Sequence, residues 1–344
     1  MNQIWQSFLQ NQQAVIVNDR VLHFGDSAAE LNYTKNDTVI IDLSHFGLIH
    51  IFGEEAQAFL QGQLTCDVRK IEPNKAQYGG YCTPKGRLLA NFMLWHNESY
   101  MMQLPASLCP AIQKRLSMYV LRAKVQLMDS SKSLVRIGVA GKNARMIIEK
   151  ILGTTFGPDP RLAVAQSEQT RIICLAANRY ELITSIEYAS TLWTRLKEHA
   201  NPTGAACWDW LEIQSGIPVI LPDTQEEFLP QMINMDAIES VSFQKGCYPG
   251  QEIVARTQYL GKIKRRMYLA NISSSAFVAV GDDLFSPKMA QQSCGKIVNV
   301  APSPCGGFDV LAVIQVSSVE ADKIHWKTLK GPVLKIHPLP YSLS

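Results

Sequence analysis

The sequence predicts an α+β protein of about two or three domains. Its 344 residues exceed what one hydrophobic core usually holds, and 47% hydrophobic with 18% charged residues is a globular composition. A strand–helix–strand–strand–helix succession within residues 131–200 is typical of a ferredoxin-like lobe. After residue 261, short strands separated by Gly, Pro and Ser clusters indicate a small β-barrel.

The composition excludes several classes of protein. A net charge of +3 does not suggest a dedicated nucleic-acid binder, although Lys262–Arg266 is a basic connector. The eight cysteines show no Cys-x-x-Cys and no zinc-like Cys/His spacing, so we expect reduced thiols and no metal site. No signal peptide or membrane-length apolar run is evident. We therefore expect a cytoplasmic monomer without a membrane partner.

The first 130 residues contain mostly strand patterns. A hairpin is predicted between 15–17 and 21–24, across Asn18 and Asp19. A second hairpin turns at 84–87. The remaining patterns predict strands at 38–44, 48–53, 78–83, 88–95 and 100–104, and helices at 54–64 and 109–121.

The next seventy residues form the ferredoxin-like pattern. Strand 135–141 is followed by helix 143–152, which Gly153 ends. A hairpin around Asn178 joins strands 171–175 and 179–183, and an amphipathic helix covers 190–198. We expect these elements to fold as one lobe.

The last part of the chain begins with a helix at 208–215. Pro218, Pro222 and Pro230 then predict an irregular segment. The expected barrel has strands at 267–272, 295–300, 310–316 and 333–336.

Residues 245–252, Lys-Gly-Cys-Tyr-Pro-Gly-Gln-Glu, contain the most distinctive chemistry. Gly246, Gly250 and Pro249 predict a rigid turn with Cys247 near its apex. Positive charge near a thiol favours the thiolate, and Lys245 and Arg256 are the candidates to supply it. The alternative interpretation is that Cys247 is a small buried hydrophobe, as lone cysteines often are.

Together with other motifs, this turn resembles the YgfZ family of folate-binding proteins, which are relatives of the glycine-cleavage T protein. The matching motifs are spread along the chain: 61–68 (QGQLTCDV), 83–87 (TPKGR), 213–218 (IQSGIP), 228–231 (FLPQ), 245–256 (KGCYPGQEIVAR) and 337–342 (HPLPYS). An ordered series of matches of this kind is more specific than any single motif.

The resemblance implies a GcvT-like fold with a central cavity for tetrahydrofolate or a one-carbon derivative of it. In that arrangement residues 1–130 and 201–260 form a folate-binding α/β lobe. Residues 131–200 form the ferredoxin-like lobe, and 261–344 form the C-terminal β-barrel. The resemblance also implies a role in iron–sulfur cluster assembly or repair, with iron–sulfur enzymes, including tRNA-modifying ones, as partners.

A folate site needs an aromatic face for the pterin, a polar side chain for the ring edge and cations for the glutamate tail. Trp208 matches a tryptophan that the family uses against folate, and Phe46 falls where a second one occurs. Gln214 stands where relatives usually carry Glu, and an amide offers the ring edge one acceptor and one donor group. Arg87 and Arg256 are the candidates for the tail. The alternative is that the aromatic residues are core residues and the arginines surface ones.

Turnover chemistry is not evident from the sequence. The aminomethyltransferase relatives carry an acidic residue after the Gly-Arg hairpin, where this chain has Asn91, which cannot act as a carboxylate base. Cys247 is then the plausible reactive group. Three functions stay open: a folate-binding accessory factor for iron–sulfur enzymes, which we favour; a folate-dependent one-carbon transferase; and a module that binds tRNA directly through Lys262–Arg266.

Overall fold

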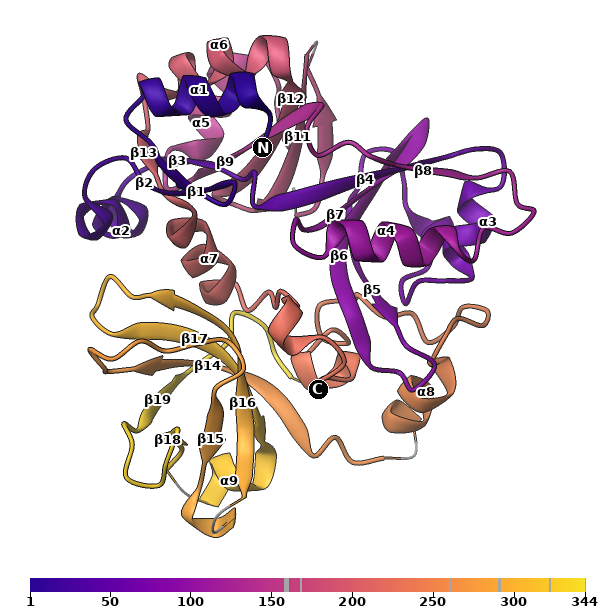
Figure 1. Ribbon diagram of the computed structural model, residues 1–344, viewed down its shortest axis with the longest axis vertical. Helices are drawn as coiled ribbons and strands as arrows, with labels where there is room; N and C mark the ends of the chain where they lie inside the picture. The colour runs from indigo at the N-terminus through magenta and orange to yellow at the C-terminus, as the bar shows by residue number, and fades with distance from the viewer. Residues whose placement is uncertain (158–160, 168, 260, 290–291, 322, 344) are drawn as a thin grey trace. The chain divides into compact units, whose positions relative to one another are not determined.

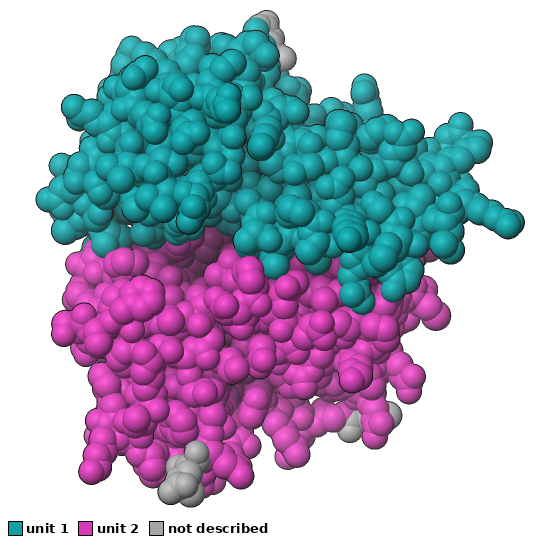
Figure 2. All heavy atoms as spheres, viewed as in Figure 1, with its two compact units in different colours: residues 1–56, 70–77, 93–208 teal, residues 57–69, 78–92, 209–344 magenta. Residues whose placement is uncertain are grey.

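The computed structural model describes residues 1–157, 161–167, 169–259, 261–289, 292–321 and 323–343. The chain divides into two compact units, coloured in Figure 2. Unit 1 comprises residues 1–56, 70–77 and 93–208, and unit 2 comprises 57–69, 78–92 and 209–344. The domain boundary predicted at 260 and the predicted end at 344 lie outside the described residues.

Unit 1 contains a six-stranded sheet with the order β10-β11-β12-β9-β3-β13. All neighbouring strands in it are antiparallel except β13 and β3, which are parallel. The strands are Val39–Asp42 (β3), Leu134–Ala140 (β9), Val164–Gln166 (β10), Thr170–Ala176 (β11), Arg179–Ser185 (β12) and Asn201–Thr203 (β13). The predicted succession of elements in 131–200 is therefore present, and strands from outside that range extend its sheet.

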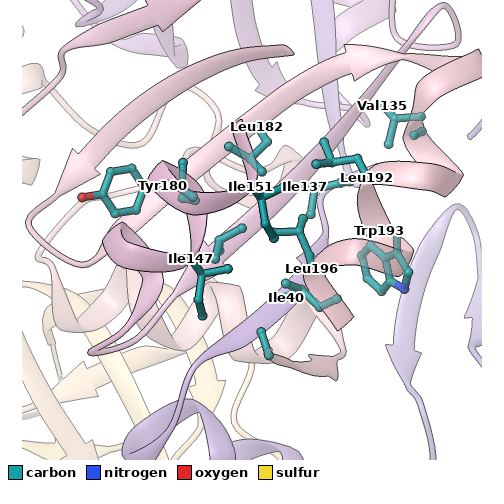
Figure 3. Packing of buried hydrophobic residues seen from close by; sticks show 14 of the residues in the cluster. Ile40, Val135, Ile137, Ile147, Ile151, Tyr180, Leu182, Leu192, Trp193 and Leu196 are labelled. Carbon is teal, nitrogen blue, oxygen red and sulfur yellow. The ribbon is translucent and has the colours of Figure 1, made fainter. Parts of the chain in front are cut away.

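Three helices pack with this sheet: α1 (Gln3–Asn11), α5 (Ala144–Leu152) and α6 (Ile186–Lys197) (Figure 1). The apolar core lies between helices and sheet, where side chains of α5 and α6 turn toward Ile40, Ile137 and Leu182 (Figure 3). Because side chains alternate across a strand, the residues next to Ile137 and Leu182 point to the opposite face. That opposite face carries the polar residues described below.

The structure adds helices at the start of the chain, where only a hairpin was predicted. Besides α1, a helix spans Ser27–Asn36 (α2). Side chains of Asn2 and Asp26 cap the two helices by accepting hydrogen bonds from backbone amides. The predicted hairpin between them is confirmed: Val15–Val17 (β1) pairs with Arg20–His23 (β2), and Asn18 and Asp19 take positive φ.

A second sheet has the order β5-β6-β7-β4-β8, and its residues are divided between the two units. Its strands are Phe46–Phe52 (β4), Gln77–Cys82 (β5), Leu88–Asn97 (β6), Ser99–Pro105 (β7) and Gln126–Asp129 (β8). The turn predicted at 84–87 joins β5 to β6, with Gly86 at φ 71°. Helix α4 spans Cys109–Ser117, so it ends before the predicted residue 121.

Unit 2 combines short helical segments with a curled sheet near the C-terminus. The helices that lie mainly in it are Ala56–Gln61 (α3), Ala205–Gln214 (α7), Gln251–Tyr259 (α8) and Val316–Ala321 (α9), and 3-10 turns span Val68–Lys70, Pro222–Thr224, Pro230–Ile233 and Pro287–Met289. The predicted irregular segment after residue 215 is confirmed, since it contains only short 3-10 turns.

The C-terminal sheet has the order β18-β15-β16-β17-β14-β19. Its strands are Arg265–Ile272 (β14), Asp283–Phe285 (β15), Ser293–Pro302 (β16), Phe308–Gln315 (β17), His325–Trp326 (β18) and Leu334–His337 (β19). A bridge between His325 and Val333 links its two edges, so the sheet curls around its own apolar core. In the described ranges, no helix is long and apolar enough to cross a membrane.

Candidate functional site

Six residues of unit 1 form a cluster that centres on strand β9. We call it the β9 cluster, and its members are Phe46, Gln103, Arg136, Arg179, Glu181 and Trp208. Arg136 and Gly138 lie two residues apart on β9, so both face away from the helix-covered core. Glu181 is the β12 register partner of Gly138. Phe46 and Trp208, both predicted from the sequence, each contact this strand: Phe46 through its carbonyl oxygen at Arg136, and Trp208 at Gly138.

Trp208 is fully buried against β9, with only 1% of its surface exposed. A Cβ at position 138 would lie 2.5 Å from the indole ring, so only glycine lets the ring approach this closely. The Arg179 guanidinium lies 5.3 Å from the ring centroid, within the range of a cation–π contact. The predicted role of Trp208 against folate stays a prediction.

Arg136 connects the cluster to Phe46. Its Nη2 donates a hydrogen bond of 2.6 Å to the Phe46 carbonyl oxygen, while Nε and Nη1 have no hydrogen-bond partner among the described residues. Burial lowers the pKa of Arg136, and the nearby Glu181 and Asp42 carboxylates oppose this effect. A buried guanidinium with two unpaired nitrogens is an unusual feature, because buried donors are normally paired.

Glu181 and Gln103 complete the polar part of the cluster. Gln103 Nε2 donates a 2.8 Å hydrogen bond to a Glu181 carboxylate oxygen. The Gln103 carbonyl oxygen Oε1 is buried and has no partner within the described ranges. The cluster therefore offers unused donors on Arg136 and an unused acceptor on Gln103, beside a carboxylate.

Arg136, Gln103 and Glu181 were not predicted from the sequence. Each interrupts an apolar strand: Arg136 lies between Val135 and Ile137, and Glu181 lies between Tyr180 and Leu182. A charged residue inside an otherwise apolar strand costs free energy unless it has a partner. That interruption was the available signal, but it does not reveal which strands meet.

In unit 2, the turn at 245–252 packs against the loop at 61–68, so two of the sequence motifs meet. Lys245 is 6% exposed, and its Nζ donates to the carbonyl oxygens of Leu64 (2.6 Å) and Cys66 (2.8 Å). Burial lowers the pKa of Lys245 to about 8. Tyr248 is buried and lies under the ammonium, 5.3 Å from ring centroid to Nζ.

Cys247 is exposed, unlike the other cysteines near it. Cys66 and Cys82 are buried, and burial raises the pKa of both thiols to about 12. The alternative prediction, that Cys247 is a buried core residue, is therefore not met by the structure. No group of three or more His, Cys, Asp or Glu side chains suited to a metal ion occurs in the part of the chain that the structure describes.

The remaining predicted residues of unit 2 do not form one cluster in the hydrogen-bond pattern. Arg87 donates to the Glu227 carbonyl oxygen, and Gln214 Nε2 donates to Asp309 at 3.0 Å. Arg256 is exposed on helix α8. Their proposed roles toward folate or the thiol stay predictions.

Asn91, where the transferase relatives are expected to carry an acid, uses both ends of its amide. Its Nδ2 donates to the Pro218 carbonyl oxygen at 2.6 Å, and its Oδ1 accepts from the Ile220 amide at 2.8 Å. A carboxylate could replace only the acceptor. Asn91 therefore holds the segment around residue 219 through a pair of bonds that an acid cannot make.

The chain is similar in sequence to a family model and to several known proteins. A family model described as the GCVT N-terminal domain matches residues 5–245. The chain is 35% identical over 237 residues to the tRNA-modifying protein YgfZ of Colwellia psychrerythraea, covering 68% of this chain and 72% of that protein. It is 30% identical over 312 residues to the tRNA-modifying protein YgfZ of Sodalis glossinidius, covering 89% and 93%.

Among solved structures, the glycine cleavage system aminomethyltransferase T from Bartonella henselae is similar to the chain, with a TM-score of 0.79. The match covers 99% of this chain and 97% of that one, at 16% sequence identity. The likeness confirms the predicted GcvT-like fold, a mixed α/β protein with a C-terminal curled sheet.

Proposed function

We propose that this chain, which belongs to the family of the tRNA-modifying protein YgfZ and contains the GCVT N-terminal domain, binds a reduced folate and acts in tRNA modification. The match to the Sodalis relative, over 93% of that protein's length, carries the proposal, because it spans the fold and the motifs together. In finer terms, the chain is an accessory protein for iron–sulfur cluster assembly or repair that supports tRNA-modifying iron–sulfur enzymes.

The β9 cluster supports the folate part of the proposal. A pterin edge carries donors and acceptors side by side, and such an edge can pair with the donors of Arg136, the Gln103 oxygen and the Glu181 carboxylate. Trp208 is the proposed aromatic contact for the pterin, and Phe46 is a second aromatic residue of the same cluster. When bound, a reduced folate would supply its one-carbon chemistry, while the chain's own residues bind and orient it.

Gln214 and Arg87, also predicted from the sequence, lie in unit 2. They are proposed independently of the β9 cluster, Gln214 as a polar contact for a folate and Arg87 as a cation for its glutamate tail. The proposed domains are a folate lobe of residues 1–130 with 201–260, a ferredoxin-like lobe of residues 131–200, and a barrel of residues 261–344.

Cys247 supports the iron–sulfur part of the proposal. Its thiol is exposed on a turn that the chain holds in place, and it takes part in thiol exchange or in transient handling of an iron–sulfur intermediate. Arg256 is the proposed cation for the thiolate. If a Cys247→Ala variant fully restored iron–sulfur enzymes in cells that lack the protein, this role would be excluded.

Calorimetric titration with tetrahydrofolate tests the folate proposal. Trp208 and Trp193 are both fully buried, but Trp193 belongs to the helix-covered core on the other face of the six-stranded sheet. We expect Trp208→Phe to weaken binding by about fivefold, the factor that a lost aromatic contact of about 1 kcal/mol gives, and Trp193→Phe to leave it unchanged. No heat of binding to the wild-type protein would contradict the proposal.

A one-carbon transferase is the weaker alternative because of Asn91. Its amide is committed to Pro218 and Ile220, and it offers no carboxylate for transferase chemistry. An assay for glycine cleavage separates the two functions: the accessory role predicts no turnover.

A second candidate is direct contact with RNA, which exposed residues near the end of α8 favour. Tyr259 is 67% exposed, and Lys262, Lys264 and Arg265 are exposed after it. Cations beside an exposed aromatic ring suit phosphates and bases. Arg266 does not contribute, because it is buried and paired with Asp236 at 2.7 Å. A salt-dependent shift of tRNA that disappears when Lys262, Lys264 and Arg265 are changed to Gln would support this contact.

A further inference from the structure

The contact between the turn at 245–252 and the loop at 61–68 carries an inference about Lys245. The Lys245 ammonium is enclosed by two carbonyl oxygens of the loop, those of Leu64 and Cys66, and by the ring of Tyr248. These contacts use two of the three N–H donors of the ammonium, and the ring lies beside it. The side chain therefore joins two segments that are 179 and 181 residues apart in sequence.

The loop that receives Lys245 is itself held in one conformation. Gln61 accepts from the Val68 amide at 2.8 Å and donates to Asp67 at 2.9 Å, so one side chain spans the loop. Thr65 Oγ1 donates to the Ser240 carbonyl oxygen and accepts from the Gly80 amide, both at 2.8 Å. These hydrogen bonds do not involve Lys245, so they hold the carbonyl oxygens that it contacts in place independently of the lysine.

The other end of the turn is anchored as well. Gln251 Nε2 donates to the Lys245 carbonyl oxygen at 3.2 Å, which closes the turn on itself. A Cβ at Gly250 would lie 2.5 Å from the Thr83 carbonyl oxygen, so the turn presses against the 83–87 hairpin. Gly246, by contrast, has no atom within 4 Å of where a Cβ would be, and Cys247 is exposed.

We propose that Lys245 is a positioning residue: by binding the Leu64 and Cys66 carbonyl oxygens, it holds the turn against the 61–68 loop so that Cys247 faces outward and Cys66 stays covered. The alternative, expected from the sequence, is that Lys245 acts on Cys247 through its charge. The charged and titratable groups that face the ammonium are Asp67 and Cys66 from the loop, Arg69 directly after it, and Tyr248 from the turn itself.

This inference deepens the proposed role of Cys247 and rests on it for its functional meaning, but its test needs no folate. In a Cys305→Ser background, Cys247 is the exposed cysteine among the described residues. The rate of alkylation by iodoacetamide, measured for each cysteine-containing peptide by mass spectrometry, then reports the solvent accessibility of each thiol. Loss of folate binding would leave the alkylation rates unchanged. The proposal for Lys245 and the proposal of folate binding can therefore be refuted independently.

We expect Lys245→Met to raise the alkylation rate of Cys66 roughly tenfold or more, since a single charge-assisted hydrogen bond contributes about that factor to the closed state. Buried Cys174 of unit 1 and Cys294 of the C-terminal sheet should stay protected. Lys85→Met is the matched control, because Lys85 is an exposed lysine on the neighbouring hairpin. It should leave Cys66 protected.

Two results would overturn the proposal. One is unchanged protection of Cys66 in Lys245→Met. The other is a displaced pH profile of Cys247 alkylation with Cys66 still covered, which is what action through charge requires. If Lys245→Met exposes Cys174 and Cys294 too, the variant has lost its fold and the milder Lys245→Gln is used, which keeps one donor group. An intermediate alkylation rate at Cys66 in Lys245→Gln supports the proposal, and a wild-type rate overturns it.

Discussion

Arg136 in unit 1 and Lys245 in unit 2 are both buried cations, but their surroundings differ. Lys245 donates to two carbonyl oxygens and lies over an aromatic ring. Arg136 donates to one carbonyl oxygen, and two of its nitrogens have no partner in the described part of the chain. A cation with satisfied donors serves the fold, whereas unused buried donors beside a carboxylate fit a ligand. The comparison separates a positioning residue from a binding residue.

The largest expected effect comes from Arg136→Met. The change would remove the buried positive charge that acts on the Glu181 and Asp42 carboxylates, and leaving a buried carboxylate uncompensated costs about 3–5 kcal/mol. Urea unfolding of the ligand-free protein measures this loss. The double variant Arg136→Met with Glu181→Gln should recover part of it, and a loss of less than about 1 kcal/mol in the single variant would contradict the account of the cluster.

The pH dependence of stability tests the burial of Lys245. Its pKa is lowered from 10.5 to about 8 in the folded protein. Between these two values the unfolded chain binds more protons at Lys245 than the folded one, so this residue's contribution to the free energy of unfolding rises with pH and is lost as pH falls through about 8.

Compared with Lys245→Met, the wild-type protein should gain about 1–3 kcal/mol between pH 8 and 10.5. Unfolding in urea at several pH values, for both proteins, gives the difference. If the difference in free energy of unfolding between the two proteins did not change across this pH range, the ammonium would not be desolvated as the contacts require.

A smaller effect is expected at Asn91, the residue that separates this chain from a transferase. Asn91→Asp removes the donor to the Pro218 carbonyl oxygen and places a carboxylate beside it, at a cost of about 2 kcal/mol. Thermal unfolding measures this cost, with Asn97→Asp as a control because Asn97 is exposed at the end of β6. A variant of unchanged stability that also gained glycine-cleavage activity would overturn our interpretation of Asn91.

Much of the local structure could be predicted from the sequence. The hairpins at Asn18–Asp19 and at 84–87 carry their turn residues in the expected places, and Gly153 ends α5 in the left-handed conformation. The missed helices α1 and α2 each follow a capping residue, Asn2 or Asp26, so their starting signal was present.

The sites were harder to predict than the elements. Strand alternation turns Arg136 and Glu181 to one face of the six-stranded sheet, and Gln103 reaches Glu181 from β7 of the second sheet. Which strands and sheets become neighbours is a property of the tertiary fold. Lys245 was recognised as important, but the direction of its side chain follows from the carbonyl oxygens of a loop about 180 residues earlier. Sequence motifs identified the participants, and only the fold shows their contacts.

The most direct test of the central claim is a crystal structure of the protein soaked with tetrahydrofolate. Our account predicts density for the pterin beside Trp208, with its ring edge within hydrogen-bond distance of Glu181, Gln103 or Arg136. A soaked crystal in which these three side chains bind only protein or water, with the folate elsewhere or absent, would contradict it.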